Sequence, residues 1–230
     1  MCGRFANSES VPVLRRIFAA DGPDVDWQPS YNITPTRHVP VLLGDQRSRR
    51  LGLMRWGWNP ASLGGKLLIN CRGEEAHAKR MFDRILPKQR CLVPATQFYE
   101  WQPPPTLKGR SKIRPLPFAF ALKAESPFLI GGLWTASAGA GSMILMTTPA
   151  NGVVAPVHDR MPLIIAPEHA GEWLDPATDG TRIRSLIAPD AENRWRSWPV
   201  GLGISDVHRD DVGLLEPLRD ASTSPGYDQP

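Results

Sequence analysis

Apolar residues recur at helical spacing in two stretches of the chain. Val11, Leu14 and Phe18 follow serines that can cap a helix, so they predict a first helix that ends before a Gly-Pro pair. Residues 74–86 carry a second stripe, with acids in its first turn and Pro87 beyond its end, and predict the clearest helix of the chain. Both stripes indicate helices that pack one face against a core.

Short apolar runs bounded by Gly, Pro and charged residues predict strands along most of the remaining chain. The predicted strands are residues 38–43, 51–56, 66–72, 90–101 with a bend at Pro94, 116–122, 128–134, 142–148 and 161–166. The segments between them are predicted to be a loop at 24–37, a proline-rich basic connector at 102–115, and short helices at 167–174 and 181–187.

Seven or eight short strands with a few interleaved helices predict an α+β fold. We expect a single domain with a twisted, barrel-like, mainly antiparallel β-sheet and flanking short helices. This domain is predicted to span residues 1–220, and the polar residues 221–230 are predicted to form a disordered tail.

The composition is that of a globular protein with many loops. Of the 230 residues, 41% are hydrophobic and 22% are charged, and the 24 prolines are about twice the usual share. No stretch approaches the ~18 apolar residues that cross a membrane, and the N-terminus lacks the apolar core of a secretory signal. We therefore expect a cytoplasmic protein without a membrane partner.

The cysteines and glycines argue against several kinds of site. Cys2, Cys71 and Cys91 are an odd number without CxxC spacing, so a disulfide framework and a cysteine-rich zinc site are not expected. The chain has no Walker or Rossmann glycine pattern. We expect no metal, no nucleotide and no other cofactor.

Positive charge is concentrated in the body of the chain. Residues 1–203 hold 25 of the 27 basic residues and 17 of the 23 acidic ones, and 21 of the bases are arginine. Arginine grips phosphate oxygens with a planar fork, and the eight tryptophans supply rings on which bases can stack. The charge is compatible with nucleic acid, although an arginine-rich genome produces the same bias.

Cys2 becomes the first residue if Met1 is removed, which aminopeptidases do when the second residue is small. The chain would then start with an α-amine of pKa about 7.7–8.0 beside a thiol of pKa about 8.5. This amine can condense with an aldehyde to an imine, and the thiol can close a thiazolidine ring on it. A free cysteine is more often a small buried hydrophobic residue, so Cys2 alone decides nothing.

Three further polar residues stand where chemistry is plausible. Asn70 shares a strand face with Arg72, Glu100 ends an apolar strand beside two aromatic residues, and His158 lies two residues from Arg160. A partly desolvated carboxylate and a histidine both suit proton transfer. Each residue also has an ordinary structural interpretation, such as a strand-end asparagine or an acid paired with an arginine.

The order and wording of eight motifs resemble those of the SRAP (SOS-response-associated peptidase) family. These motifs are MCGRF (1–5), YNITPT (31–36), MRWGW (54–58), INCRGE (69–74), RCLVP leading to FYEW (90–101), GLW (132–134), TTPAN (147–151) and HDRMP (158–162). The resemblance runs from residue 1 to about residue 175. Of the family's late signature, only a remnant at 207–211 is recognisable.

The resemblance implies a sensor of abasic sites in single-stranded DNA that forms a covalent thiazolidine link through Cys2 and shields the lesion. It implies that Asn70 positions Cys2, that Glu100 shuttles protons, and that His158 assists opening of the sugar ring and reversal of the link. It also implies DNA contacts from five residues: Arg4, Arg72, Arg160, Trp56 and Trp101. The protein would be associated with the nucleoid when it is bound to DNA.

Two other interpretations of the same residues stay open. A cysteine-type peptidase or amidohydrolase, including one that removes its own Met1, would use Cys2, Glu100 and His158 on a peptide bond. A noncovalent single-strand binding module would show steep salt dependence and no preference for a lesion. We expect a monomer in each case.

Overall fold

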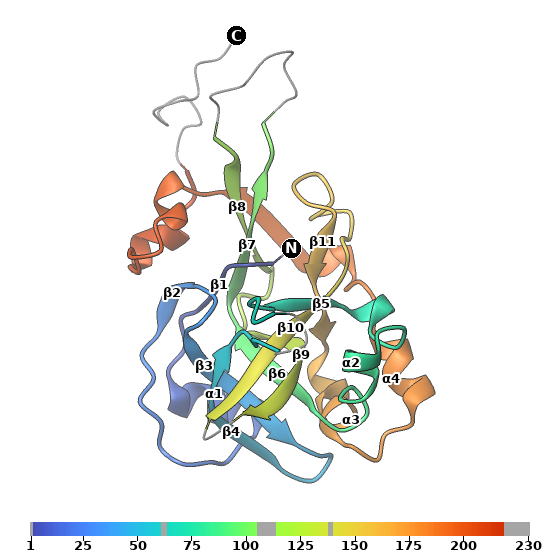
Figure 1. Cartoon of the computed structure of the whole chain (residues 1–230). Coiled ribbons are helices and arrows are strands. Elements are labelled where there is room, and N and C mark those ends of the chain that lie inside the picture. Colours follow the sequence, from blue (N-terminus) through green and yellow to red (C-terminus); the bar gives the residue numbers. More distant parts are fainter. Residues whose placement is uncertain (1, 61–63, 105–113, 138–139, 219–230) are drawn as a thin grey trace.

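The computed structural model describes residues 2–60, 64–104, 114–137 and 140–218 (Figure 1). Its strands are β1 Phe5–Asn7, β2 Ser30–Ile33, β3 His38–Gly44, β4 Arg49–Trp56, β5 Asn70–Arg72, β6 Arg90–Ala95, β7 Gln97–Gln102, β8 Leu116–Leu122, β9 Phe128–Ser137, β10 Ala140–Pro149, β11 Arg160–Pro162, β12 Ile164–Ile165 and β13 Trp195–Pro199. Its α-helices are α1 Val11–Phe18, α2 Arg80–Asp83, α3 Ala170–Leu174 and α4 Gly180–Leu186. Short 3-10 helices are η2 Gly73–Glu75, η3 Pro167–His169, η4 Glu192–Arg194, η5 Leu202–Ser205 and η6 Val212–Leu215.

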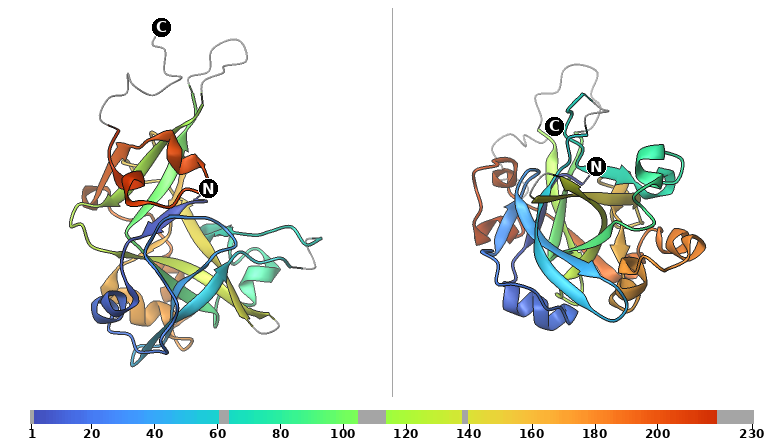
Figure 2. Two further views of the ribbon diagram at one scale, coloured as in Figure 1. Left: turned by 90° about the vertical axis from the view of Figure 1, so that its left-hand side faces the viewer. Right: turned by 60° about the horizontal axis from the view of Figure 1, so that its bottom comes forward.

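The strands form two sheets. The smaller sheet has the order β13-β8-β7-β1-β2, and the larger has the order β11-β10-β4-β3-β6-β9-β12 with β5 attached to β10. Because β9 also pairs with β10, the strands β10, β4, β3, β6 and β9 follow one another in a ring (Figure 2). The pairs β4–β10 and β5–β10 are parallel and the other strand pairs of the described chain are antiparallel.

Aromatic side chains join the two sheets. Phe98 and Phe120 of the smaller sheet stack at 4.8 Å, and Trp195 meets Phe128 of the larger sheet edge-on at 5.1 Å. Alternation along each strand sends these rings to the same buried side. Large aromatic surfaces contribute much of the hydrophobic stabilisation of such a core.

The predicted α+β fold with a twisted, mainly antiparallel sheet is confirmed. The first helix is also confirmed, since α1 starts after Ser10 and ends at Ala19 in the left-handed conformation with a φ of 48°. The strands predicted at 38–43, 51–56, 116–122, 128–134 and 142–148 correspond to β3, β4, β8, β9 and β10.

The long helix predicted over residues 74–86 is wrong. That segment holds η2, a turn, and the four-residue helix α2, because Lys79 is extended with φ −100° and ψ 109°. The side chain of Glu75 accepts from Arg72 at 2.7 Å and lies 2.6 Å from Lys79 Nζ. These exposed ion pairs connect β5, η2 and the residue before α2, and the extended Lys79 divides the predicted helix.

Other expected boundaries need correction. The strand predicted at 90–101 divides into β6 and β7 of different sheets, because Thr96 donates its N–H to Ala6 O at 2.8 Å and turns the chain. Only residues 70–72 of the strand predicted at 66–72 pair as β5, and the strand predicted at 161–166 divides into β11 and β12. The predicted loop 24–37 contains β2. The strands β1 and β13 were not predicted, because they are short and mix polar with apolar residues.

Some expectations concern residues that the structure does not describe. Most of the connector at 102–115 and the whole tail at 221–230 lie outside the described residues. Within the described ranges, no helix is long and apolar enough to cross a membrane.

A stability prediction follows from the packing of the ring. A Cβ at Gly132 in β9 would lie 2.7 Å from Ile144 O and 3.1 Å from Cys91 Sγ, whereas a Cβ at Gly52 in β4 would meet nothing within 4 Å. We expect Gly132→Ala to lower the free energy of unfolding in urea by about 1–3 kcal/mol. The matched change Gly52→Ala is expected to leave it within about 0.5 kcal/mol, and equal losses in both variants would contradict this packing.

Candidate functional site

The four residues predicted to be catalytic lie together at one end of the smaller sheet. Cys2 precedes β1, Asn70 is the first residue of β5, Glu100 lies in β7 and His158 precedes β11. Figure 1 shows the start of β1 close to β5, β7 and β11. Segments far apart in the sequence therefore supply one site.

Cys2 is placed by the pairing of β1 with β7. Phe5 is the register partner of Phe98, and Tyr99 donates its N–H to Arg4 O at 3.0 Å, so the residues before β1 run alongside Glu100. Cys2 is 0% exposed, and its Sγ lies 3.7 Å from Arg4 O. Burial raises the pKa of the Cys2 thiol well above its usual range, and the nearby Glu100 carboxylate raises it further. Both effects favour the neutral thiol over the thiolate.

Asn70 fixes the backbone of Cys2. Its Nδ2 donates to Cys2 O at 2.7 Å, and the side chain comes from β5, which is held parallel to β10 with Leu145 opposite Asn70. Asn70 is 6% exposed, and its buried Oδ1 accepts no hydrogen bond from the described residues. A buried acceptor of this kind is costly to leave unpaired. It is available to a donor on the amine of Cys2 or on a substrate.

Glu100 is a buried acid beside Cys2. The carboxylate is 3% exposed, and burial raises the pKa of Glu100 to about 7, with the charge of Asp159 acting in the same direction. An acid with a pKa near neutrality holds and releases a proton with little driving force either way. That property suits general acid–base chemistry.

His158 faces Glu100 through one ring nitrogen. Its Nδ1 accepts the Arg160 N–H at 2.9 Å, so the neutral ring carries its proton on Nε2, which lies 3.9 Å from Glu100 Oε2. Burial lowers the pKa of His158 and favours this neutral form. Asp159 Oδ1 lies 3.0 Å from Nδ1 of His158. When the ring is charged, Nδ1 can donate a hydrogen bond to this carboxylate oxygen. The histidine can thus exchange protons at the side that faces Glu100.

Two of the predicted DNA-contacting residues support each other. The guanidinium of Arg4 lies 5.6 Å from the ring centre of Trp101, and it donates to Asn32 Oδ1 and Ile204 O. Trp101 is half-buried and donates its indole N–H to Ser205 Oγ at 3.1 Å. Trp101 packs with the small cluster of Tyr99 and Ile204, so this pair lies on the face of the smaller sheet opposite to Glu100.

Arg72 and Arg160 differ in their access to solvent. Arg72 is exposed and lies 2.7 Å from Glu75, whereas Arg160 is buried in a two-pronged contact with Glu74 and also donates to Thr147 O at 2.8 Å. A phosphate would reach Arg72 directly. It would reach Arg160 only if the contact with Glu74 opens.

Trp56 lies in the core and not on the surface of the site. Its ring is 0% exposed, packs 5.2 Å from Phe5, and donates its indole N–H to Ile69 O at 2.9 Å. In this arrangement no face of the ring is open to a base. Trp56 instead supports the segment that leads into Asn70.

Sequence reasoning missed a clamp formed by the C-terminal segment. Asp210 accepts from Ser30 Oγ, Tyr31 N and Asn32 N at 2.7, 2.6 and 3.1 Å. Asn32 in turn donates to the carbonyls of residues 206 and 209 and accepts from Arg4. The position of Asn32 in the YNITPT motif and the remnant at 207–211 were the available signals.

The described residues do not gather a metal site. Among residues 2–60, 64–104, 114–137 and 140–218, no group of three or more His, Cys, Asp or Glu side chains could hold a metal ion.

Comparisons with known proteins decide the family. The family model "SOS response associated peptidase (SRAP)" matches residues 1–207. The chain belongs to the SRAP family. The match extends the resemblance seen in the motifs, which ended near residue 175, as far as residue 207, three residues before Asp210 of the clamp.

Relatives of this SRAP chain match over nearly their whole length. The abasic site processing protein YoqW of Bacillus subtilis is 34% identical, with 94% of this chain and 99% of that protein covered. The abasic site processing protein YedK of Escherichia coli is 27% identical, with 95% of this chain and 100% of that protein covered. A crystal structure of a protein from Bacteroides thetaiotaomicron has the same fold, with a TM-score of 0.80 at 18% identity over 94% of this chain and all of that one.

The raised pKa of Glu100 predicts a pH effect on stability. Folded Glu100 binds its proton more tightly than unfolded Glu100, so its contribution is fully present at low pH and is lost as the pH rises toward about 7. Between pH 4.5 and pH 7.5, Glu100 is expected to lower the unfolding free energy of the wild type by about 1–3 kcal/mol. The variant Glu100→Gln should lack this loss.

The exposed acid Glu168 provides the matched control for this profile. Urea unfolding at several pH values should give parallel curves for wild type and Glu168→Gln. The difference between wild type and Glu100→Gln isolates Glu100, because His158 and the other groups are common to both. A constant difference across this pH range would contradict the raised pKa.

Proposed function

We propose that this protein senses abasic sites in single-stranded DNA and links to them covalently through Cys2 after Met1 has been removed. Its membership of the SRAP family, and relatives named abasic site processing proteins, support the abasic site as substrate. The observation that carries the chemistry is the contact of Asn70 with Cys2 O at 2.7 Å, beside the buried carboxyl of Glu100.

Cys2 supplies both nucleophiles of the reaction, its α-amine and its thiol, and the atoms of the reaction balance without a further reactant. An abasic sugar in its open form presents an aldehyde. The α-amine of Cys2 adds to the aldehyde carbon, and loss of one water leaves an imine. The Sγ–H then adds across the C=N bond, so that sulfur bonds to carbon and the proton goes to nitrogen. The product is a thiazolidine that uses both nucleophiles of Cys2 and removes the aldehyde needed for strand cleavage by β-elimination.

Each neighbour of Cys2 has a step that fits its chemistry. The open Oδ1 of Asn70 would accept a hydrogen from the α-amine, while its Nδ2 holds the backbone. Glu100, with a pKa of about 7, would donate the proton that lets water leave and take one from the thiol. His158 would assist opening of the sugar and reversal of the link through its Nε2 side.

Cationic and aromatic residues on the segments that form the site suit a DNA strand. Arg72 offers an exposed guanidinium, and Arg4 with Trp101 offers a cation beside an aromatic ring, which is the usual combination for single-stranded nucleic acid. Arg160 would join these contacts after release from Glu74. We propose that a monomer carries out the reaction.

The neutral thiol weighs against a cysteine-type peptidase as the main activity. A peptidase nucleophile needs a thiolate, produced by a lowered pKa or an adjacent base, and burial with Glu100 acts in the opposite direction on Cys2. Thiazolidine formation starts at the amine and uses the thiol as S–H. Peptide cleavage by the mature protein without DNA would favour the peptidase.

Cys2→Ala is expected to abolish the covalent product while leaving most noncovalent DNA binding. Cys2→Ser is expected to give at most a labile imine, because the weaker nucleophile closes the ring poorly. The measurement is a denaturing gel with intact mass analysis after mixing protein with an oligonucleotide that carries one abasic site. A normal adduct from Cys2→Ala would overturn the proposal.

Asn70→Ala is expected to slow adduct formation by about 100-fold, because a reacting amine that is misplaced by about 1 Å loses that order of rate. Binding of an oligonucleotide with a stable abasic analogue should change less than threefold. The exposed Asn193 gives the control variant Asn193→Ala. Equal adduct rates in both variants would remove Asn70 from the mechanism.

A further inference from the structure

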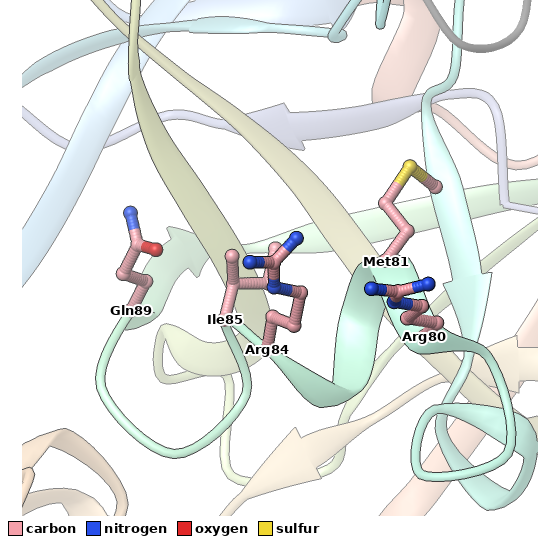
Figure 3. Close-up of a pocket in the computed structure, with 5 residues that line it drawn as sticks. All are labelled: Arg80, Met81, Arg84, Ile85 and Gln89. Carbon is pink, nitrogen blue, oxygen red and sulfur yellow. The ribbon is translucent and has the colours of Figure 1, made fainter.

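A second basic surface lies on α2, away from the four residues around Cys2. Arg80, Met81, Arg84, Ile85 and Gln89 line a pocket there (Figure 3). Figure 3 shows the five side chains following one another along α2 and the turn after it, with the two guanidinium groups at different points of the row. The pocket therefore combines two cations with an apolar and an amide component.

The cations of this surface are available to a ligand. Arg80 and Arg84 are exposed, their guanidinium groups form no ion pair or hydrogen bond with the described residues, and Lys88 next to them is exposed as well. The acids in the neighbourhood are already engaged. Asp83 lies 3.7 Å from His77, and Glu75 lies between Arg72 and Lys79. The surface keeps an excess of positive charge.

The surface is connected to the site by a short stretch of chain. β5 begins at Asn70 in the site and leads through η2 into α2, and Figure 1 shows this path running from beside β1 toward α2. Arg72, Glu75 and Lys79 bridge β5 and α2 by contacts of 2.7 and 2.6 Å. A strand that leaves the site past Arg72 meets further cations on α2.

The floor of the pocket is apolar. Met81 and Ile85 are half-buried and pack against the hydrophobic core. The backbone N–H of Trp134 donates to Gln89 O at 2.9 Å, which ties the end of the row to β9. Single-strand binding grooves place cations along the path of the nucleic-acid backbone, and apolar surface between the cations can support sugars and bases.

We propose that Arg80 and Arg84 bind the phosphates of the DNA that flanks the lesion on one side, with Met81 and Ile85 under the adjacent sugars and bases. This inference rests on the proposed function and extends the DNA path from Cys2 through Arg72 to α2. Because the surface lies to one side of the site, it contacts only one of the two flanks of a lesion.

The test uses oligonucleotides with a stable abasic analogue and measures binding by fluorescence anisotropy. One oligonucleotide has short flanks, and two others are extended by about ten nucleotides on the 5′ side alone or the 3′ side alone. The variant is R80E/R84E. The control R16E/R47E makes the same change of net charge at exposed arginines of α1 and the β3–β4 turn.

We expect R80E/R84E to lose about tenfold in affinity for one extended oligonucleotide and less than threefold for the other two. The slope of log affinity against log salt should fall by about 1.4 for that oligonucleotide alone, because two phosphate contacts at about 0.7 each are lost. Equal affinities of R80E/R84E and R16E/R47E on all three would overturn the inference. A uniform loss on all three would also overturn it, because it would indicate a general charge effect.

Adduct formation distinguishes this inference from the proposed function. With the short-flank oligonucleotide carrying a true abasic site, R80E/R84E should form the adduct like wild type. If wild type forms none, the proposed function fails whatever the binding data show. If DNA binding is unchanged but the variant loses affinity for a protein with an acidic surface, α2 is a protein-docking surface and the DNA assignment is wrong.

Discussion

The pairing of β1 between β2 and β7 is the constraint on which the rest of the site depends. A chain terminus is usually poorly ordered unless a sheet or a packed contact holds it. Here three residues of strand, the Arg4 contacts to Asn32 and Ile204, and the Asn70 contact to Cys2 O fix the first residues. A reactive residue at the start of the chain thereby acquires the fixed geometry of an internal one.

Burial then favours the protonation states that the proposed chemistry needs. The same low-polarity surroundings that favour the neutral thiol of Cys2 raise the pKa of Glu100 to about 7. A thiolate beside a carboxylate would be costly in these surroundings, whereas a thiol beside a protonated acid is not. In the proposed reaction, Glu100 would hold a proton at the place where the imine forms.

The sequence predicted the fold class and the site better than it predicted the elements between them. Cys2, Asn70, Glu100 and His158 come from four separate motifs and lie close to one another, while their catalytic roles stay a prediction. The helix at 74–86 was wrong because Lys79 is extended and divides the apolar stripe between a turn and α2, which periodicity alone does not reveal. Trp56 was assigned to DNA, yet its ring is buried, since a motif does not tell which way a side chain points.

The clamp by Asp210 shows a different limit of prediction. Its partners at residues 30–32 are about 180 residues away in the chain, and no local pattern encodes such a pairing. The basic surface on α2 likewise lies in a segment that was predicted to be one longer helix. Both features depend on tertiary contacts, which periodicity does not carry.

The central claim is that one N-terminal residue supplies both nucleophiles. The most direct measurement is fragmentation mass spectrometry of the N-terminal peptide after the adduct with abasic DNA is digested. The account predicts a sugar-phosphate remnant on Cys2, loss of one water relative to the separate reactants, and no Met1. A remnant on a lysine, or on a peptide that still carries Met1, would contradict it.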